Sequence, residues 1–180
     1  MINKEILADP EISATVPDWS REYKSMFAWD PSRALLASIR AYQSYSKSSF
    51  FLSKIAKKIA VFRHRFWSIV TGADIPINTK IEGGLLIPHP NGIVIHPSVE
   101  VGANCLIFQQ VTIGSANGYG PPKIGGHVDI GAGAKILGEL FIGEHAKIGA
   151  NAVVLIDVPA GRTAVGIPAK IIQTLEYYEN

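Results

Sequence analysis

The 180-residue sequence has one cysteine, few charged residues and no long uninterrupted apolar run. Because Cys105 is the only cysteine, an intrachain disulfide framework and a zinc site built from several cysteines are excluded. A single cysteine also suits a reducing compartment. Glycine, proline and charged residues interrupt every candidate for the eighteen or more apolar residues of a membrane span. The first residues, MINKEILADPEI, lack the apolar core of a signal peptide, so we expect a cytoplasmic protein.

The proportions of charged and apolar residues exclude further classes of protein. Charged residues make up 18% of the chain and hydrophobic residues 47%, against about a quarter charged in an average soluble protein. So much apolar surface must be buried within the fold or between subunits, and we expect an oligomer. A formal net charge of +2 is too small for a nucleic-acid-binding protein. We expect no metal site.

Residues 1–72 hold most of the aromatic side chains and a single glycine, and they predict an α-helical region. Asp9 with Pro10, and Asp30 with Pro31, are typical helix starts, because Asp caps the first turn and Pro fits the first helical position. Apolar residues recur at helical spacing over residues 35–42 and again over residues 55–69.

Basic residues lie off the second apolar stripe, at Lys54, Lys57, Lys58 and Arg65. The simpler interpretation is a solvated helix face. The alternative is contact with an anionic membrane or a lipid-linked substrate, which would place the protein at the inner face of the membrane.

From Ile75 onward the sequence repeats every six residues. Residues 124–159 read IGGHVD, IGAGAK, ILGELF, IGEHAK, IGANAV and VLIDVP, with an aliphatic first position and a small or aliphatic fifth position. This period predicts short parallel strands joined by turns, three to a coil, with the aliphatic side chains stacked inside. We therefore predict a parallel β-helix over residues 73–172 and a tail at 173–180. Repeats of this aliphatic-glycine type are typical of the left-handed form, an exception to right-handed crossovers.

Two places break the six-residue step. Ile87 and Ile95 are eight residues apart, so the turn that contains His89 is enlarged. Ile113 and Ile124 are eleven apart, so GSANGYGPPK, residues 114–123, forms a longer loop. Because binding and catalytic residues often lie on loops held by a rigid scaffold, we expect a functional site at these irregularities.

Several of these stretches resemble one enzyme family. ADIPINTKIEGGLLIPHPNGIVI, LIFQQVTIG, IGAGAKILG, IGANAVV and VGIPAKII are similar to the serine acetyltransferase branch of the hexapeptide-repeat acyltransferases, which includes relatives that acetylate surface saccharides. The resemblance covers residues 73–172 and, loosely, the helical region. In that family an Asp in the first coil pairs with a His fifteen residues later, which is the general base. Asp74 and His89 have this identity and separation.

The resemblance implies a mechanism and an assembly. His89 would take a proton from an acceptor hydroxyl while Asp74 orients its ring. The oxygen would then attack the thioester of acetyl-CoA, with a backbone amide near Gly114 as oxyanion donor. Coenzyme A would lie between neighbouring subunits of a homotrimer, against backbone near Ala132 and Ala150 and with Lys170 near the end of the groove. Whether two trimers pair through their helices stays open.

The sequence departs from the family at three positions that hold serine. Family members have Asp immediately before the catalytic His, and Arg-His before Pro-Lys-Ile, where this chain has Pro88, Gly120 and Pro121. Because these charged contacts are missing and Tyr119 adds to a neutral rim, a sugar hydroxyl of a surface polysaccharide or its precursor is slightly favoured as acceptor. L-Serine is the alternative, and Asp30 matches an N-terminal Asp that binds the serine ammonium group.

Two further implications concern partners. A non-catalytic β-helix that serves as a binding or assembly module is the alternative from another class, although a pure scaffold has no need of the Asp and His pair. The chain ends at Asn180, where many family members have the Ile that docks into cysteine synthase. This difference argues against that complex.

Overall fold

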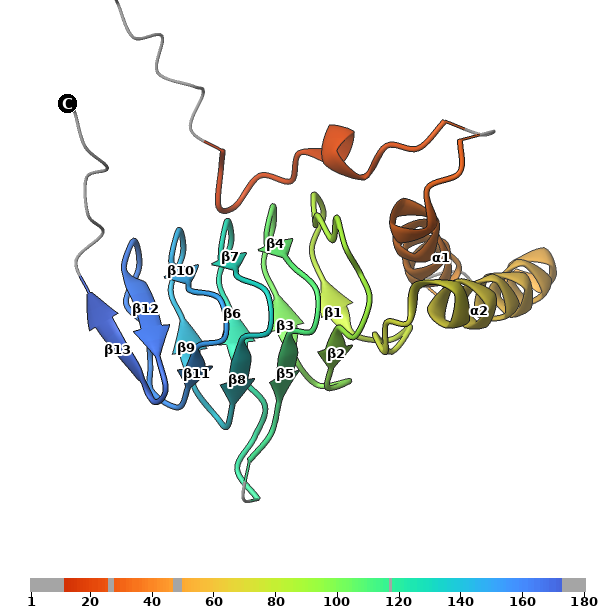
Figure 1. The fold of residues 1–180 in the computed structure, drawn as a ribbon. Helices are drawn as coiled ribbons and strands as arrows, with labels where there is room; N and C mark the ends of the chain where they lie inside the picture. The colour runs from red at the N-terminus through yellow and green to blue at the C-terminus, as the bar shows by residue number, and fades with distance from the viewer. Residues whose placement is uncertain (1–11, 26–27, 47–49, 117, 173–180) are drawn as a thin grey trace, which may run out of the picture.

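The computed structural model describes residues 12–25, 28–46, 50–116 and 118–172. A short 3-10 turn, η1 (Trp19–Glu22), precedes two helices, α1 (Pro31–Ser46) and α2 (Phe51–Thr71). The helices stand at one end of a stack of short strands (Figure 1). The helix start predicted at Asp30 and Pro31 is confirmed, since the Asp30 carboxylate accepts the N–H of Arg33 at 3.1 Å. The start predicted at residues 9 and 10 lies outside the described residues.

The strands are two to four residues long and form a three-sided coil. They are β1 (Lys80–Ile81), β2 (Val94–Ile95), β3 (Glu100–Val101), β4 (Leu106–Ile107), β5 (Thr112–Gly114), β6 (Lys123–Ile124), β7 (Asp129–Ile130), β8 (Lys135–Leu137), β9 (Phe141–Ile142), β10 (Lys147–Ile148), β11 (Val153–Val154), β12 (Thr163–Gly166) and β13 (Ala169–Ile172). One sheet has the order β1-β3-β6-β9, the second β4-β7-β10-β12-β13 and the third β2-β5-β8-β11. We call them the β1, β4 and β2 sheets. Pairing is parallel except between β12 and β13.

The interior consists of the repeat positions that the sequence predicts. Ile107, Ile130 and Ile148 lie above one another in the β4 sheet and are 0 to 3% exposed. Cys105 occupies a fifth position of the repeat and is also buried, and this burial raises the pKa of its thiol to about 12. Each coil therefore contributes a layer of aliphatic side chains to one continuous core, as expected for a solenoid.

The three sheets meet at three corners, and each corner is a column of stacked turns. At the corner between the β1 and β4 sheets, Asn104, His127 and His145 all have positive φ, from 52° to 60°. Their N–H groups donate to the turn of the preceding coil, to Gly83, Ala103 and Gly126 respectively. Asn tolerates this left-handed conformation better than most residues do, because its short polar side chain can bond locally. The left-handed turn residues and their amide bonds therefore stack the turns in a column. Side chains at equivalent turn positions then lie next to one another.

Residues 12–25 run along this corner as an extended segment that we call the strap (Figure 1). The buried side chain of Asn104 holds it: its Oδ1 accepts the N–H of Asp18 at 2.8 Å, and its Nδ2 donates to the carbonyls of Ser13 and Val16 at 2.7 and 2.8 Å. Arg21 adds a bond from its Nε to the carbonyl of Gly84 at 2.8 Å. These bonds use both N–H donors and the carbonyl oxygen of the Asn104 amide, so the strap is docked specifically.

The strap also fixes α1 to the first coils. Glu22 and Arg40 form an ion pair at 2.7 Å with side chains only 8 and 17% exposed. The same guanidinium donates to the carbonyls of Ile81 and Glu82 and lies 5.4 Å from the centre of the Trp19 ring. A planar guanidinium with several donors suits such a junction better than an ammonium group. As a result the second half of α1 is held against the start of the β-helix.

His64 makes the corresponding contact for α2. Its Nε2 lies 2.8 Å from the carbonyl oxygen of Ile75, in the first coil. Burial is the largest influence and lowers the pKa of His64, while the Ile75 carbonyl and the charge of Asp74 act in the opposite direction. The neutral ring is therefore the form that the fold favours.

We expect an alanine at Gly84 to destabilise the protein more than an alanine at Gly161. Both glycines have positive φ, 81° and 66°, so both changes strain the backbone by about 1–2 kcal/mol. A Cβ on Gly84 would lie 1.9 Å from Oδ1 of Asn104, whereas nothing lies within 4 Å of one on Gly161. Disturbing the Asn104 bonds adds about 1–3 kcal/mol. Denaturant unfolding measures the difference, and equal losses would show that the strap adds no stability.

The protonation of His64 predicts a pH dependence of stability. Because the pKa of His64 is lowered in the folded state, its contribution is present above the unfolded pKa of about 6.5 and is lost as the pH falls below it. His64→Gln keeps a donor for the Ile75 carbonyl but does not titrate. Unfolding free energies measured from pH 8 to pH 5 should therefore fall less steeply in the variant. Parallel curves for the two proteins would contradict this assignment.

Candidate active site

A cavity of about 450 Å³ lies where the two helices meet the enlarged turn before β2. Its lining comes from the start of α1, the end of α2 and the turn itself: Trp29, Asp30, Pro31, Ser32, Val70, Thr71, Pro88, His89, Pro90 and Asn91. The sequence predicted His89 and Asp30 as site residues, and the fold brings them to the same cavity. We call it the His89 cavity.

The turn presents His89 outward from a rigid frame. Pro88 and Pro90 flank it and restrict the backbone on both sides. Ile87 and Ile93 are 2 and 0% exposed and anchor the two ends of the turn in the core, while the His89 side chain is exposed. An enlarged turn between two buried isoleucines therefore gives one imidazole a fixed position at the surface.

Asp30 reaches the cavity as the capping residue of α1. Its carboxylate accepts bonds from the hydroxyl of Ser32 at 2.9 Å and from the backbone of Arg33, and it lies 3.3 Å from the Arg33 guanidinium. The Arg33 side chain in turn donates to the carbonyl of Arg21 in the strap at 3.2 Å. The side chain of Asp30 is 27% exposed, so part of the carboxylate can still receive a ligand.

Asp74 begins the first coil, and its side chain is not bonded to His89 among the described residues of the single chain. Its backbone pairs with β2 through Ile93 and Ile95. Its carboxylate is exposed, and no hydrogen bond or ion pair within the described residues joins it to the His89 ring. The charge of Asp74 acts on His64, where it raises the pKa against the larger effect of burial. The Asp74 and His89 dyad therefore stays a prediction.

The predicted coenzyme A positions share a corner with His89. The turn amides form a ladder there: Gln110 donates to Asn91, Gly133 to Gln109, and Asn151 to Ala132, at 2.8 to 2.9 Å. This corner lies between the β4 and β2 sheets, and we call it the His89 corner. Ala132 and Ala150 stand in this column, so a chain-like ligand along the corner would pass both and end at the His89 turn.

The other predicted residues lie elsewhere in the single chain. Gly114 ends β5 with open space around it, beside the long loop. Tyr119 in that loop is 67% exposed and does not line the His89 cavity, because the loop leaves the prism at the corner between the β2 and β1 sheets. Lys170 is in β13 at the far end of the stack. Tyr119 as an acceptor-binding residue therefore stays a prediction, because in one chain it lines a different cavity.

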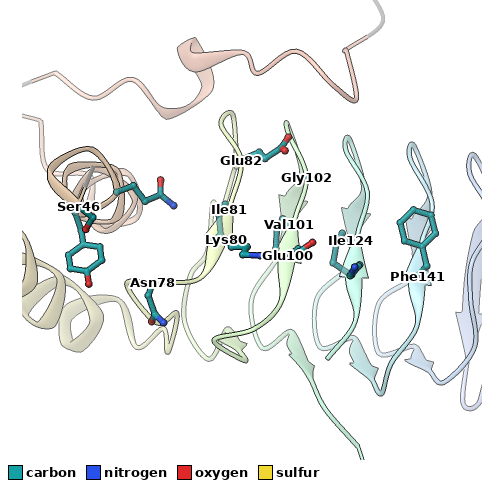
Figure 2. Close-up of a pocket in the computed structure, with 13 residues that line it drawn as sticks. Ser46, Asn78, Lys80, Ile81, Glu82, Glu100, Val101, Gly102, Ile124 and Phe141 are labelled. Atoms are coloured by element: carbon teal, nitrogen blue, oxygen red, sulfur yellow. Dashed lines mark hydrogen bonds and ion pairs between the residues drawn. The ribbon is translucent and has the colours of Figure 1, made fainter. Parts of the chain in front are cut away.

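A larger cavity, of about 830 Å³, lies over the outer face of the β1 sheet and the end of α1. Figure 2 shows Lys80, Glu100 and Phe141 on three strands of this face, β1, β3 and β9, with β6 between the last two. Lys80 and Glu100 pair with each other at 2.7 Å, so their charges are already compensated. None of the predicted catalytic residues lines this cavity. We place the site at the smaller His89 cavity because its lining contains an imidazole and a carboxylate that could take part in the reaction.

Sequence reasoning missed several residues of the site. Trp29 is 76% exposed and packs edge-to-face on Trp67 with ring centres 5.7 Å apart, which places an aromatic face at the cavity. Thr71 and Asn91 complete the lining. Their only sequence signals were adjacency to the Asp-Pro helix start, to the first coil and to His89. In the described part of the chain, no group of three or more His, Cys, Asp or Glu side chains could hold a metal ion.

Comparisons with known proteins agree with this site. A serine acetyltransferase of Helicobacter pylori strain J99 is 35% identical over 159 residues, which is 87% of this chain and 89% of that protein. Soybean serine acetyltransferase complexed with serine is 38% identical, with a TM-score of 0.65, over 78% of this chain. A serine acetyltransferase in complex with CoA is 34% identical, with a TM-score of 0.67, over 80% of this chain.

The match is uneven in length. The chain spans 56 and 58% of the two solved chains that it matches. A scan against models of protein families gave no match. The Helicobacter relative, by contrast, is matched over nearly its whole length, and the solved relatives have the left-handed coil that is typical of aliphatic-glycine repeats. The chain therefore belongs to the serine acetyltransferase family of hexapeptide-repeat acyltransferases.

Proposed function

We propose that this protein is an acetyl-CoA-dependent O-acetyltransferase with His89 as its general base. The observation that carries the proposal is the placement of an outward imidazole in a cavity with Asp30, at the end of the column that holds Ala132 and Ala150. An imidazole is suited to this task because it exchanges protons near neutral pH. A solved relative at 34% identity is described in complex with CoA, which supports this donor.

The proposed reaction transfers one acyl group and returns the proton. The imidazole of His89 takes the proton of the acceptor hydroxyl as its oxygen bonds to the thioester carbonyl carbon. The tetrahedral oxyanion is stabilised by a backbone N–H, for which Gly114 is the predicted donor. The carbon–sulfur bond then breaks, and the imidazolium returns the proton to the departing thiolate. Asp74, if it turns to the ring, orients the imidazole as a positioning residue.

L-Serine is the better supported acceptor. The relatives compared here are named serine acetyltransferases, and one is described as complexed with serine. Asp30 supplies a carboxylate in the cavity, which suits an ammonium group. The sequence-based preference for a sugar hydroxyl finds no support among these relatives, and the order of the two acceptors is therefore reversed.

A sugar hydroxyl is the second candidate because of the composition of the cavity. No Lys or Arg lines the His89 cavity in the described single chain, so a serine carboxylate would lack a cationic partner there. Trp29 offers an exposed aromatic face, and Pro88 and Pro90 are uncharged. These features suit a neutral ring more than a zwitterion.

We also propose a homotrimer, because three-fold packing would complete the site. The β2 sheet lies between the His89 corner and the corner from which residues 114–123 project. If the β2 sheets face the three-fold axis, the loop of one subunit meets the His89 corner of the next. This arrangement would bring Tyr119 and Gly114 of a neighbour toward the cavity, and it explains why one chain leaves the cavity open.

His89→Ala should lower kcat/KM for acetyl transfer by roughly 10²–10⁴-fold, the usual contribution of a positioned general base. Thiol release from acetyl-CoA in the presence of acceptor measures this loss. His96→Ala is the control, since His96 lies at a different corner and bonds the backbone of Ser98. Equal activity of the two variants would contradict His89 as the base, and absence of acetyl transfer by the unmodified protein would favour the non-catalytic binding module.

Asp30→Asn distinguishes the two acceptors. If L-serine is the acceptor, removing the carboxylate charge should raise its KM roughly 10–100-fold, as expected for a charge-assisted bond. KM for acetyl-CoA should stay unchanged. Turnover of a neutral saccharide, with a KM insensitive to Asp30→Asn and no turnover of L-serine, would establish the sugar instead.

A further inference from the structure

The outer side of α2 carries an apolar stripe that nothing in the described part of the chain covers. It consists of Leu52, Ile55, Ile59, Phe62, Phe66 and Ile69. These side chains are 45 to 83% exposed. Because successive helical residues turn by about 100°, the six positions fall within a sector of about 100°. A surface helix normally turns its polar side outward, whereas α2 exposes apolar side chains on this face.

The other side of α2 is the one that packs on the protein. Ala60 and Thr71 are 2 and 6% exposed, and His64 bonds the first coil. The Lys57 ammonium lies 4.7 Å from the centre of the Tyr42 ring of α1. The core of the protein therefore has its own helix face, and the stripe is additional to it.

Only positive charges border the stripe. Lys54, Lys58 and Arg65 fall along one margin of the sector and Arg63 along the other, and all four are exposed. The segment 51–71 has no Asp or Glu. Whatever binds this face must be apolar at its centre and negative at its edges, which describes the interface of an anionic lipid bilayer.

We propose that α2 docks the protein on an anionic lipid bilayer. The helix lies in the plane of the interface, with the stripe among the upper acyl chains and the four cations at lipid phosphates. Neither described helix has the length and apolarity to cross a bilayer. Val70 and Thr71, at the end of α2, line the His89 cavity, so docking holds that cavity close to the lipid surface. This inference does not depend on the identity of the acceptor.

A second copy of the chain fits the face less well. The alternating spacing of three and four residues would also suit a seam between helices. Such a seam brings the margins of two helices together, with Lys58, Arg63 and Arg65 on both and no carboxylate on either. Lipid phosphates neutralise these charges, whereas a second α2 repels them.

Vesicle co-sedimentation of the full chain tests the proposal. We expect binding to phosphatidylcholine vesicles that contain about one third phosphatidylglycerol, and weak binding to phosphatidylcholine alone. The triple variant Lys54→Gln, Lys58→Gln and Arg65→Gln should bind the anionic vesicles roughly 100-fold more weakly, because each cation contributes about fivefold. Raising the salt concentration should weaken binding of the unmodified chain in the same way.

Phe62→Ser tests the apolar stripe, with Phe141→Ser as the matched control. Phe62 is 74% exposed on α2, and Phe141 is 50% exposed on β9, so neither change opens the core. We expect Phe62→Ser to reduce vesicle binding at least tenfold, with acetyl transfer in solution unchanged, and Phe141→Ser to bind normally.

Two outcomes would overturn the proposal. One is the absence of binding to anionic vesicles by the unmodified protein. The other is dissociation of an oligomer by Phe62→Ser in sedimentation velocity without any vesicle binding, which would assign the stripe to a second copy. Circular dichroism of each variant checks that the coil and helices remain folded.

Discussion

Parallel stacking of six-residue units is the constraint on which the structure depends. Each coil pairs its backbone with the coil before it and turns one aliphatic side chain inward per strand, so equivalent positions must lie above one another. The corners then become columns whose side chains are gathered from distant parts of the chain. In such a fold the corner that a residue occupies decides which functional residues lie near it, whatever their separation along the sequence.

The three corners carry different structural and functional features. One holds the strap through Asn104, and the strap contacts α1 through the Arg21 carbonyl and the Glu22 carboxylate, which meet Arg33 and Arg40. The second carries His89 and the column of Ala132 and Ala150. The third projects residues 114–123. Because these contacts hold α1 against the first coils, a stability feature on one corner contributes to placing Asp30 in the same cavity as His89.

The sequence predicted those parts that depend on local repetition. The aliphatic period predicted the coil and its core, and the Asp-Pro pair predicted the start of α1 and a residue of the cavity. The strap was not predictable, since Asn104 reveals its role only when Ser13, Val16 and Asp18 arrive from far along the chain. The same holds for the exposed stripe of α2: periodicity shows that a helix has an apolar side, but not that a second side packs on the core.

The site predictions show the same limit. Spacing correctly put His89 on an enlarged turn, but it could not specify the side-chain rotations that decide whether Asp74 meets His89 or lies nearer His64. Tyr119 was predicted as part of a neutral rim around the acceptor, whereas the loop that carries it leaves the coil at another corner of the same chain. A contact that requires a neighbouring subunit cannot be read from periodicity in a single one.

A crystal structure with bound coenzyme A tests the central claim most directly. The account predicts that the ligand lies along the corner formed by Gln109, Ala132 and Ala150, with its thiol directed into the cavity of His89 and Asp30. Coenzyme A bound instead over the outer face of the β1 sheet, with its sulfur remote from His89, would contradict it.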